Sequence, residues 1–247
     1  MSSGKVSVVG NGPGLPGHMT ARAREAIEES DMVIGYKLYL EQVAELTEGK
    51  EVVASAMGKE VERCRRALDE ARSGKKVALV SGGDPGIYGM AGLLFQVAGE
   101  DENRVEIEVV PGVTAAGAAA AVLGAPLMHD FAVISLSDLL TPWEQIEKRL
   151  AAAAAADFVM VIYNPRSRGR SDYLARAGEI ILAHRQEKTP VGIVRGAGRL
   201  DQQQWHTTLG ELSSYLEVVD MASLVIVGNN STYREGDKMI TPRGYPL

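Results

Sequence analysis

The sequence contains few of the residues that build disulfide-bonded or zinc-bound domains. Cys64 is the only cysteine among 247 residues, which excludes an internal disulfide and a zinc site made of several cysteines. The four histidines show no close ligand spacing, so we expect no metal site. Aromatic residues make up only 5% of the chain, whereas 27 residues are glycine. This composition favours an α/β protein with tight strand-to-helix turns over a β-sandwich.

The chain also lacks an excess of positive charge and long apolar runs. Its 26 Lys and Arg residues stand against 32 Asp and Glu residues, for a net charge of -6. The overall field would therefore not attract a polyanion such as nucleic acid. No run is long enough to span a bilayer, and no apolar signal-peptide core precedes the first strand. We expect a cytoplasmic protein with neither nucleic-acid nor membrane partners.

Along the first half of the chain, short apolar runs alternate with amphipathic ones. This alternation predicts strands and helices in turn, and hence a mostly parallel sheet covered on both faces. The expected strands are Val6–Gly10, Asp31–Gly35, Glu51–Ser55, Lys75–Gly83 and Val105–Gly112. The expected helices are Thr20–Ser30 with Thr20 as N-cap, Lys59–Arg72, Tyr88–Ala98 and Thr114–Gly124.

The second half repeats this alternation after an interruption at Gly124 and Pro126. We therefore expect two α/β domains, residues 1–124 and 125–247. The expected strands are Phe131–Ser137, Asp157–Pro165, Pro190–Gly196 and Ser223–Asn230, which would close the sheet. The stretch QQWHTTLGEL, residues 203–212, alternates in a way that also suits an antiparallel strand. The expected helices are a long one up to Ala156, capped by Thr141 with Pro142 at N1 and Glu144 at N3, and Asp172–His184.

The first strand runs into the glycine-rich loop VVGNGPGLPGHMT, residues 8–20, which suggests a dinucleotide site. A dinucleotide-binding loop needs G-x-G-x-x-G, a helix that starts at the loop, and an acidic residue after the second strand. Here the glycines are Gly10, Gly12 and Gly14, two prolines remove backbone donors, and the helix starts late. Asp31 stands at the start of its strand rather than after it, and would lie at the wrong end of the sheet. The loop therefore argues against NAD binding.

Two more glycine loops follow strands of the same predicted sheet, SGGDPGIYGMAG at residues 81–92 and VVPGVTAAG at residues 109–117. Each is also an ordinary strand-to-helix turn when considered alone. Because the carboxyl ends of parallel strands share one edge, we expect all three loops to converge there. In the second half, IYNPRSRGR at residues 162–170 offers polar groups and arginines suited to carboxylates, or a solvated loop.

The loop motifs G-x-G-P-G, SGGDPGIYGMAG, VPGVTAA and YNPRS occur in an order that resembles the tetrapyrrole methylases, S-adenosylmethionine-dependent enzymes of sirohaem and cobalamin synthesis. The resemblance covers essentially the whole chain. Within that family, residues 129–150, 163–170 and 225–245 resemble the branch that methylates C-17 of precorrin-3B and contracts the ring. The resemblance implies two α/β/α domains with a cofactor cleft between them, and a homodimer.

The resemblance also implies site residues. The expected contacts of S-adenosylmethionine are Pro13, Gly82, Gly83, Asp84, Ile87, Thr114, Ala115, Asn164 and Gly196. Substrate binding is expected at Tyr36, Lys37, Ser135, Asp138, Arg166 and Arg168, of which the cationic ones suit the carboxylates of a precorrin. His129 is the first choice as acid or base in the ring contraction, because its charge changes near neutral pH. The alternative is a linker histidine that caps backbone.

Three functions remain open at this point: C-17 methylation of precorrin-3B or its cobalt form, methylation of another corrin carbon, and a non-catalytic module that binds S-adenosylmethionine. The sequence departs from the family pattern at Leu15, where an acidic residue usually follows G-x-G-P-G, and at Asn164, where a methionine often follows the tyrosine. These departures shift the expected cofactor contacts at both loops toward backbone groups.

Overall fold

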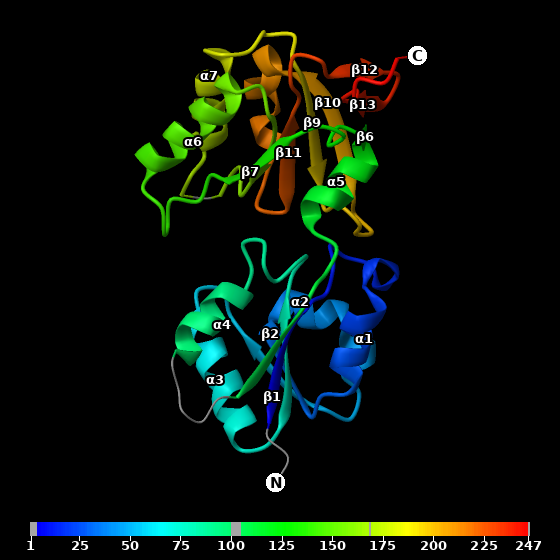
Figure 1. Cartoon of the computed structure of the whole chain (residues 1–247), viewed down its shortest axis with the longest axis vertical. Coiled ribbons are helices and arrows are strands. Elements are labelled where there is room, and N and C mark those ends of the chain that lie inside the picture. Colours follow the sequence, from blue (N-terminus) through cyan, green and yellow to red (C-terminus); the bar gives the residue numbers. More distant parts are fainter. Residues whose placement is uncertain (1–3, 100–104, 168, 247) are drawn as a thin grey trace. The chain divides into compact units, whose positions relative to one another are not determined.

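The computed structural model describes residues 4–99, 105–167 and 169–246, which form two compact units, residues 1–115 and 116–247. Their elements are labelled in Figure 1. The strands of the first unit are β1 (Lys5–Gly10), β2 (Met32–Tyr36), β3 (Glu51–Ser55), β4 (Lys76–Ser81) and β5 (Glu106–Val110). Its helices are α1 (Ala21–Glu28), α2 (Lys37–Gln42), α3 (Glu60–Arg72) and α4 (Ala91–Ala98), with short 3-10 turns at Pro16–His18 and Ala44–Leu46.

The first unit is the parallel α/β layer structure that the sequence predicts. Its five strands lie in the order β3-β2-β4-β1-β5, and every pair is parallel. α1 and α2 pack one face of the sheet through Ile27 and Leu40. α3 and α4 pack the other face through Leu68 and Leu94. All five carboxyl ends therefore open onto one edge, as the glycine-loop hypothesis requires.

Helix α1 begins where its sequence predicts, because Thr20 satisfies a free backbone donor of the first turn. The Thr20 hydroxyl accepts a hydrogen bond from the amide of Ala23 at 3.1 Å. The same hydroxyl donates to the carbonyl of Pro111 at 3.2 Å. One threonine thus caps the helix and holds it to the loop after β5. The short helix α2 has no counterpart in the sequence prediction.

The second unit contains β6 (Gly124–Ala125), β7 (Phe131–Ser135), β8 (Val159–Tyr163), β9 (Pro190–Arg195), β10 (Gln203–Thr208), β11 (Ser223–Val227), β12 (Tyr233–Glu235) and β13 (Lys238–Ile240). Its helices are α5 (Ala115–Leu123), which starts at the last residue of the first unit, α6 (Trp143–Ala155), α7 (Tyr173–Leu182) and the 3-10 segment η3 (Leu209–Val218). A small separate sheet has the order β12-β13-β6.

The main sheet of the second unit is mixed rather than mostly parallel. Its order is β10-β9-β11-β8-β7, with β7 and β8 parallel. β11 is antiparallel to both neighbours and β10 is antiparallel to β9. The antiparallel β10 was predicted. The prediction that the last strand closes the sheet is wrong: β11 lies inside it, with all five residues buried.

Helices α6 and α7 and the segment η3 cover one face of this mixed sheet, with Ile146, Ile181 and Leu212 in the shared core. The long helix was expected to begin with Thr141 as N-cap. Instead Pro142 occupies the N-cap position in extended geometry, and its carbonyl accepts from Gln145 at 3.0 Å. The helix therefore begins one residue later than predicted, without a side-chain cap.

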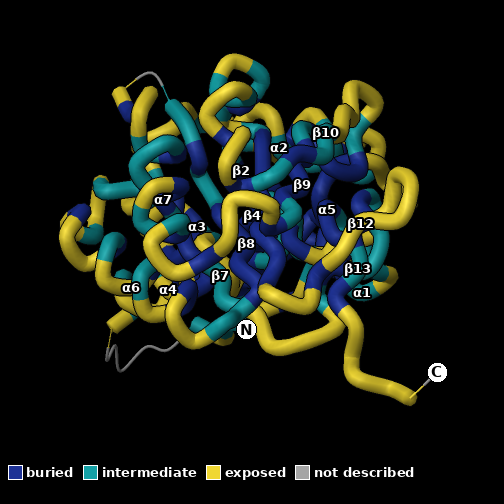
Figure 2. Tube along the Cα trace, turned by 90° about the horizontal axis from the view of Figure 1, so that it is seen from above, coloured by how far each residue is buried: buried dark blue, intermediate teal, exposed yellow. Residues whose placement is uncertain are grey.

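Helix α5 packs with the second unit. The two units therefore divide between residues 115 and 116, earlier in the chain than the predicted boundary between residues 124 and 125. In the first turn of α5, the amide of Ala116 donates a hydrogen bond to the hydroxyl of Tyr163 at 3.0 Å. A Cβ on Gly192 of β9 would lie 2.4 Å from Leu123, so the leucine rests directly on that strand. In Figure 2 the buried parts of the chain include strands of both sheets, β2, β4, β8 and β9 among them.

Candidate active site

At the carboxyl edge of the first sheet, the loops after β1, β4 and β5 are bonded and packed together. Gly12 and Gly83 exchange two backbone hydrogen bonds, of 3.2 Å and 2.9 Å. A Cβ on Gly112 would lie 2.1 Å from the carbonyl oxygen of Gly83, and one on Gly10 would lie 2.6 Å from it. Only glycine permits this backbone approach. The predicted convergence of the three loops is confirmed.

The carboxylate of Asp84 connects two of these loops. Its Oδ1 accepts from the amide of Gly86 in its own turn at 2.8 Å. Its Oδ2 accepts from the amide of Gly112 in the loop after β5 at 3.1 Å. Sequence reasoning placed Asp84 here as a ligand acceptor, whereas both oxygens already hold backbone donors. Each oxygen keeps a second lone pair that can accept from a ligand hydroxyl.

Thr114 and Ala115 lie against the same turn. A Cβ on Gly83, which has a φ of +64°, would be 3.6 Å from the amide of Ala115 and 3.8 Å from Cα of Thr114. Pro13 directly follows the bonded Gly12. The fold thus gathers five predicted cofactor residues of the first unit into one loop cluster, namely Pro13, Gly83, Asp84, Thr114 and Ala115.

Gly82 packs against an aromatic residue that sequence reasoning missed. A Cβ on Gly82 would lie 2.5 Å from the ring of Tyr39 in α2. The ring of Tyr39 in turn meets that of Tyr36 edge to face, with centroids 5.4 Å apart. The spacing of the two tyrosines in YKLY, one helical turn apart, is a signal that could have located this contact. Lys37, between them, is exposed and 4.0 Å from Glu41.

Apolar side chains stand exposed around the glycine loops. They are Leu15 after β1, Ile87 and Tyr88 after β4, and Val113 after β5. Tyr88 also has a positive φ of 52°, which is uncommon for an aromatic residue. An edge with backbone polar groups and exposed apolar side chains suits a partly aromatic ligand with hydroxyl groups better than a phosphate.

In the second unit, Ser135 and Asn164 meet at the carboxyl ends of β7 and β8. Nδ2 of Asn164 donates to Oγ of Ser135 at 2.9 Å, and the same oxygen accepts from the amide of Ser137 at 3.1 Å. Asn164 has a φ of +51°, a left-handed conformation that asparagine adopts more readily than a methionine would. Asparagine therefore suits the backbone conformation at this position.

A buried arginine organises the next loop. Arg170 donates to Oγ of Ser137 at 2.6 Å and to Oγ of Ser167 at 3.1 Å, and lies 3.6 Å from Asp138. The hydroxyl of Tyr173 donates to the other oxygen of Asp138 at 2.6 Å. This hydrogen bond lowers the pKa of Asp138 and raises that of Tyr173. Asp138 therefore stays ionised, and Tyr173 stays protonated, at neutral pH.

Two other predicted site residues, Arg166 and Gly196, form hydrogen bonds with groups of the second unit itself. Arg166 donates to the carbonyl of Leu216 and, at 3.0 Å, to Glu217, so its guanidinium is bound to η3. Arg168 lies outside the described residues. Gly196 has a φ of +61°, which favours glycine, and its amide donates to the carbonyl of Ala222 at 3.0 Å.

His129 lies at the opposite edge of the second sheet from Ser135 and Asn164. It precedes β7, whereas Ser135 ends that strand, and six residues of extended chain span roughly 20 Å. Nδ1 of His129 accepts from the amide of Asp130 at 2.8 Å, which matches the alternative of a backbone-capping histidine. Within the second unit, the structure does not bring His129 together with the other described candidates, Ser135 and Asn164.

Neither a metal cluster nor a membrane-spanning helix is found in the described ranges. No group of three or more His, Cys, Asp or Glu side chains there is placed to hold an ion. None of the helices described is both long enough and apolar enough to cross a bilayer. Burial raises the pKa of Cys64 to about 11, so this thiol is not poised to react.

Proteins of known sequence resemble this chain over its full length. A probable cobalt-factor III C(17)-methyltransferase of Salmonella typhimurium is 52% identical, over 98% of this chain and 100% of its own length. A cobalt-factor III methyltransferase of Priestia megaterium is 48% identical over 98% of this chain, which spans 45% of that longer protein.

Solved structures agree with these sequence relatives. The crystal structure of the methyltransferase CobJ matches with a TM-score of 0.92 at 38% identity, over 97% of this chain and 100% of that one. A uroporphyrin-III C-methyltransferase from Thermus thermophilus, in complex with S-adenosylhomocysteine, matches with a TM-score of 0.73 at 28% identity, over 91% and 97%. The sequence profile of the Tetrapyrrole (Corrin/Porphyrin) Methylases matches residues 5–213. This chain therefore belongs to the tetrapyrrole methylase family.

Proposed function

We propose that this chain transfers a methyl group from S-adenosylmethionine to C-17 of a cobalt-containing precorrin-3-type macrocycle, with ring contraction, in cobalamin biosynthesis. The observation that carries the proposal is the 52% identity, over the whole length of both chains, to a probable cobalt-factor III C(17)-methyltransferase. A further relative at 46% identity bears the same name. These names favour the cobalt-loaded substrate over the cobalt-free one, an alternative that the sequence left open.

The loop cluster of the first unit fits S-adenosylmethionine by the chemistry of its groups. Adenosine needs an apolar surface and hydrogen-bond partners for its hydroxyls, and the molecule carries no phosphate. The cluster offers Ile87 and Val113 as apolar neighbours, and the free lone pairs of Asp84 as acceptors. When bound, the cofactor supplies an electrophilic methyl group. We expect Gly82, Gly83, Thr114 and Ala115 to contact it largely through backbone. The contacts predicted at Asn164 and Gly196 stay predictions.

The exposed leucines of the second unit support a large apolar substrate. Leu140, Leu200 and Leu139 are 98%, 93% and 80% exposed, the highest values among large apolar side chains of the described residues. All three follow the carboxyl ends of parallel-running strands, β7 and β9, at the edge that carries Ser135 and Asn164. A tetrapyrrole presents wide apolar faces that such side chains can cover.

The reaction asks the protein mainly to hold the reacting carbon in line with the methyl group, because an electron-rich macrocycle needs no strongly activated side chain. Ser135 and Asn164 form a hydrogen-bonded pair at this edge that can orient a substrate group. Asp138, ionised and bound by Tyr173 and Arg170, holds the loop of the leucines in place. Tyr36 and Lys37 follow β2 at the corresponding edge of the first sheet.

The proposal is tested by incubating the protein with methyl-labelled S-adenosylmethionine and either cobalt-factor III or precorrin-3B. We expect one methyl to be added to the cobalt form, with the absorption spectrum of a contracted ring. Methylation without contraction, or only of another precorrin, would indicate a sibling methylase. Tight cofactor binding without transfer to any precorrin would indicate a non-catalytic module. Light scattering of the same preparation tests the homodimer that we infer from the family resemblance.

A further inference from the structure

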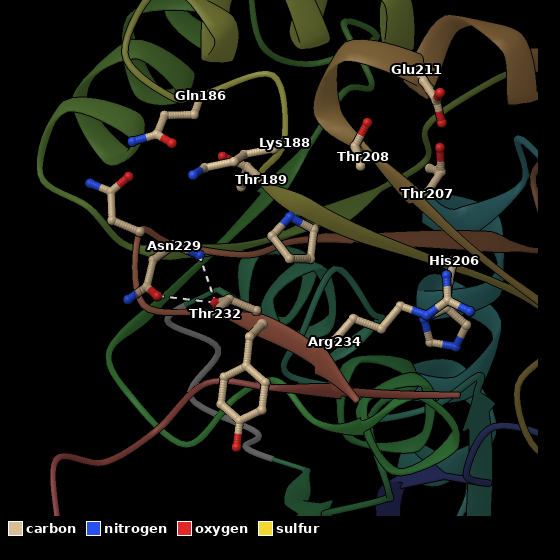
Figure 3. Close-up of a pocket in the computed structure, with 13 residues that line it drawn as sticks. Gln186, Lys188, Thr189, His206, Thr207, Thr208, Glu211, Asn229, Thr232 and Arg234 are labelled. Atoms are coloured by element: carbon tan, nitrogen blue, oxygen red, sulfur yellow. Dashed lines mark hydrogen bonds between the residues drawn. The ribbon is translucent and has the colours of Figure 1, made fainter. Parts of the chain in front are cut away.

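The second unit contains a pocket that the proposed methyl transfer does not use. It has a volume of about 410 Å³ and lies where β9 begins and β10 ends (Figure 3). Two of its lining residues, His206 and Thr207, bury the atoms Nε2 and Oγ1 without a hydrogen-bond partner among the described residues. Lys188 and Arg234 stand at opposite ends of the pocket, so their charges do not meet at one point. The pocket therefore does not define a ligand.

In the first unit, the short helix α2 supports the glycine loop that follows β4. A Cβ on Gly82 would lie 2.5 Å from Cζ of Tyr39, 2.7 Å from its Cε1 and 2.8 Å from its hydroxyl oxygen. These are the three atoms nearest to that position, so the ring of Tyr39 fills the space into which a side chain would extend. Gly82 does not have the positive φ that favours glycine at Gly83. The contact with Tyr39 is therefore the reason that residue 82 is suited only to glycine.

The ring of Tyr39 is itself held in place by its neighbours. It meets the ring of Tyr36, the last residue of β2, edge to face with centroids 5.4 Å apart. The next residue, Leu40, is buried, and a Cβ on Gly35 of β2 would lie 3.1 Å from its side chain. Helix α2 is therefore packed closely on β2, and the ring of Tyr39 cannot move away from the glycine loop without disturbing that packing.

The same helix also contacts the loop that follows β1. The side-chain amides of Gln42 and of the buried Asn11 meet at 2.7 Å. The backbone amide of Asn11 donates to the carbonyl of Ser81, the residue before Gly82, at 3.0 Å. Helix α2 thus contacts two of the three glycine loops, whereas Asp84 connects the loops after β4 and β5. Two separate sets of contacts therefore hold the turn after β4.

We propose that Tyr39 is a positioning residue for S-adenosylmethionine: its ring holds the turn of Gly82 and Gly83 so that the backbone of the turn faces the cofactor. The inference rests on the proposed function, because it takes these glycines as cofactor contacts. Tyr39 acts through the turn and not by contact with the reacting atoms. A turn that is already held in its binding conformation loses less conformational freedom when the cofactor binds, which favours affinity.

The test is a double-mutant cycle in the full chain, measured by calorimetric titration with S-adenosylhomocysteine. Gly82→Ala places a methyl group against the ring and is expected to weaken binding about tenfold or more. Tyr39→Ala removes the support of the turn and is expected to weaken binding by a similar factor. In the combined variant the clash is relieved, so Gly82→Ala should cost less than about threefold when residue 39 is already alanine. Costs that multiply independently would overturn the proposal.

Two further variants control the cycle. The Cβ of Gly112→Ala would meet the carbonyl oxygen of Gly83 and not Tyr39, so its effect on binding should be the same with tyrosine or alanine at residue 39. Tyr39→Phe keeps the ring and is expected to bind within about twofold of the wild type. Relief of Gly112→Ala by Tyr39→Ala, or a loss in Tyr39→Phe as large as in Tyr39→Ala, would contradict a role of the ring at Gly82.

Urea unfolding of the same variants separates positioning from a purely structural role. Lower stability of Tyr39→Ala with unchanged affinity for S-adenosylhomocysteine would make the residue structural only and would overturn the proposal. Methyl transfer is measured separately. If the wild type binds S-adenosylhomocysteine but methylates no precorrin, the proposed reaction fails, while the binding cycle still decides the role of Tyr39. A wild type that does not bind S-adenosylhomocysteine would overturn both.

Discussion

The amide of Gly112 donates to Oδ2 of Asp84 across 3.1 Å, so a carboxylate that follows β4 holds the loop that follows β5. The other oxygen of Asp84 holds its own turn through Gly86. The glycine loops are therefore organised from within before any ligand arrives. An aspartate at this position serves loop architecture first, and any role toward the cofactor uses its remaining lone pairs.

Asp84→Asn is expected to weaken the binding of S-adenosylhomocysteine and to lower the free energy of unfolding by about 1–2 kcal/mol, because an amide replaces one acceptor with a donor that faces a backbone N–H. Calorimetry and urea unfolding measure the two effects. The matched control is Asp69→Asn, an exposed carboxylate on α3 that pairs with Arg72 of the same helix at 2.8 Å. Unchanged binding and stability in Asp84→Asn would contradict the tie between the loops.

Gly112→Ala is expected to destabilise the first unit by about 2 kcal/mol or more, since its Cβ would lie 2.1 Å from a carbonyl oxygen in a packed backbone cluster. Gly92→Ala is the control, because a Cβ there meets nothing within 4 Å and alanine favours the helix α4. Thermal unfolding should show the first variant lowered and the second unchanged or raised. Similar midpoints for the two variants would argue against the close approach.

Glu108 is expected to stabilise the folded protein at neutral pH and not in acid. Hydrogen bonds from Arg22, and to a lesser extent from Lys5, lower the pKa of Glu108 to about 2. A carboxylate with a lowered folded-state pKa contributes stability above its unfolded value near 4.5, and that contribution is lost as the pH falls toward 2. Glu108→Gln should therefore cost about 1–2 kcal/mol at pH 7, after allowance for solvent screening, and progressively less below pH 4.

Urea unfolding of the wild type and Glu108→Gln between pH 3 and pH 7 measures this dependence. Glu106→Gln removes a more exposed neighbour on the same strand and provides the control, with a smaller expected effect. A difference between wild type and Glu108→Gln that stays constant across this pH range would contradict the assignment.

Leu139→Ser combined with Leu140→Ser is expected to raise the KM for the tetrapyrrole about tenfold, because each exposed leucine would otherwise bury its side chain against the macrocycle. The affinity for S-adenosylhomocysteine and the unfolding midpoint should not change, since both side chains are exposed in the protein. Val61→Ser, on the outer face of α3, is the control for loss of surface apolar area. A KM equal to that of the wild type would exclude these leucines from substrate contact.

His129→Ala is expected to leave turnover within about twofold of the wild type, because the residue lies at the sheet edge opposite to Ser135. Asn164→Ala, which removes the donor to Ser135, should lower turnover by about tenfold or more. Steady-state kinetics with both substrates measures the contrast. A large loss in His129→Ala, with unaltered folding by circular dichroism, would restore the acid–base role predicted from the sequence.

Much of the fold could be predicted because local patterns specify it. The alternation of apolar and amphipathic runs predicts the strands and long helices within a few residues, and Thr20 caps α1 as its position indicates. The convergence of the glycine loops also follows from parallel strand order alone. The start of α6 was misplaced, because Pro142 takes the cap position instead of the first helical one.

The candidate site was predicted less well, because hydrogen-bond partners are distant in sequence. Arg166 was expected to face the substrate, yet it bonds to η3, about fifty residues away. Tyr39 and its contact with Gly82 were missed because α2 is short and has no clear apolar pattern. Strand direction explains the wrong prediction for the acid or base. His129 is only six residues before Ser135 in the sequence, but the strand β7 between them places His129 at the opposite edge of the sheet.

The sequence by itself determined the family, the α/β class and the glycine positions, since each depends on residue type and spacing along the chain. Only the tertiary structure decided what each polar group already binds. Asp84 and Arg166 look free in the sequence, yet the fold supplies partners for both. In contrast, it leaves Nε2 of His206 and Oγ1 of Thr207 buried without a hydrogen-bond partner among the described residues. Hydrogen bonds saturate and act over short distances, so whether a side chain is available for a ligand depends on neighbours that only folding brings together.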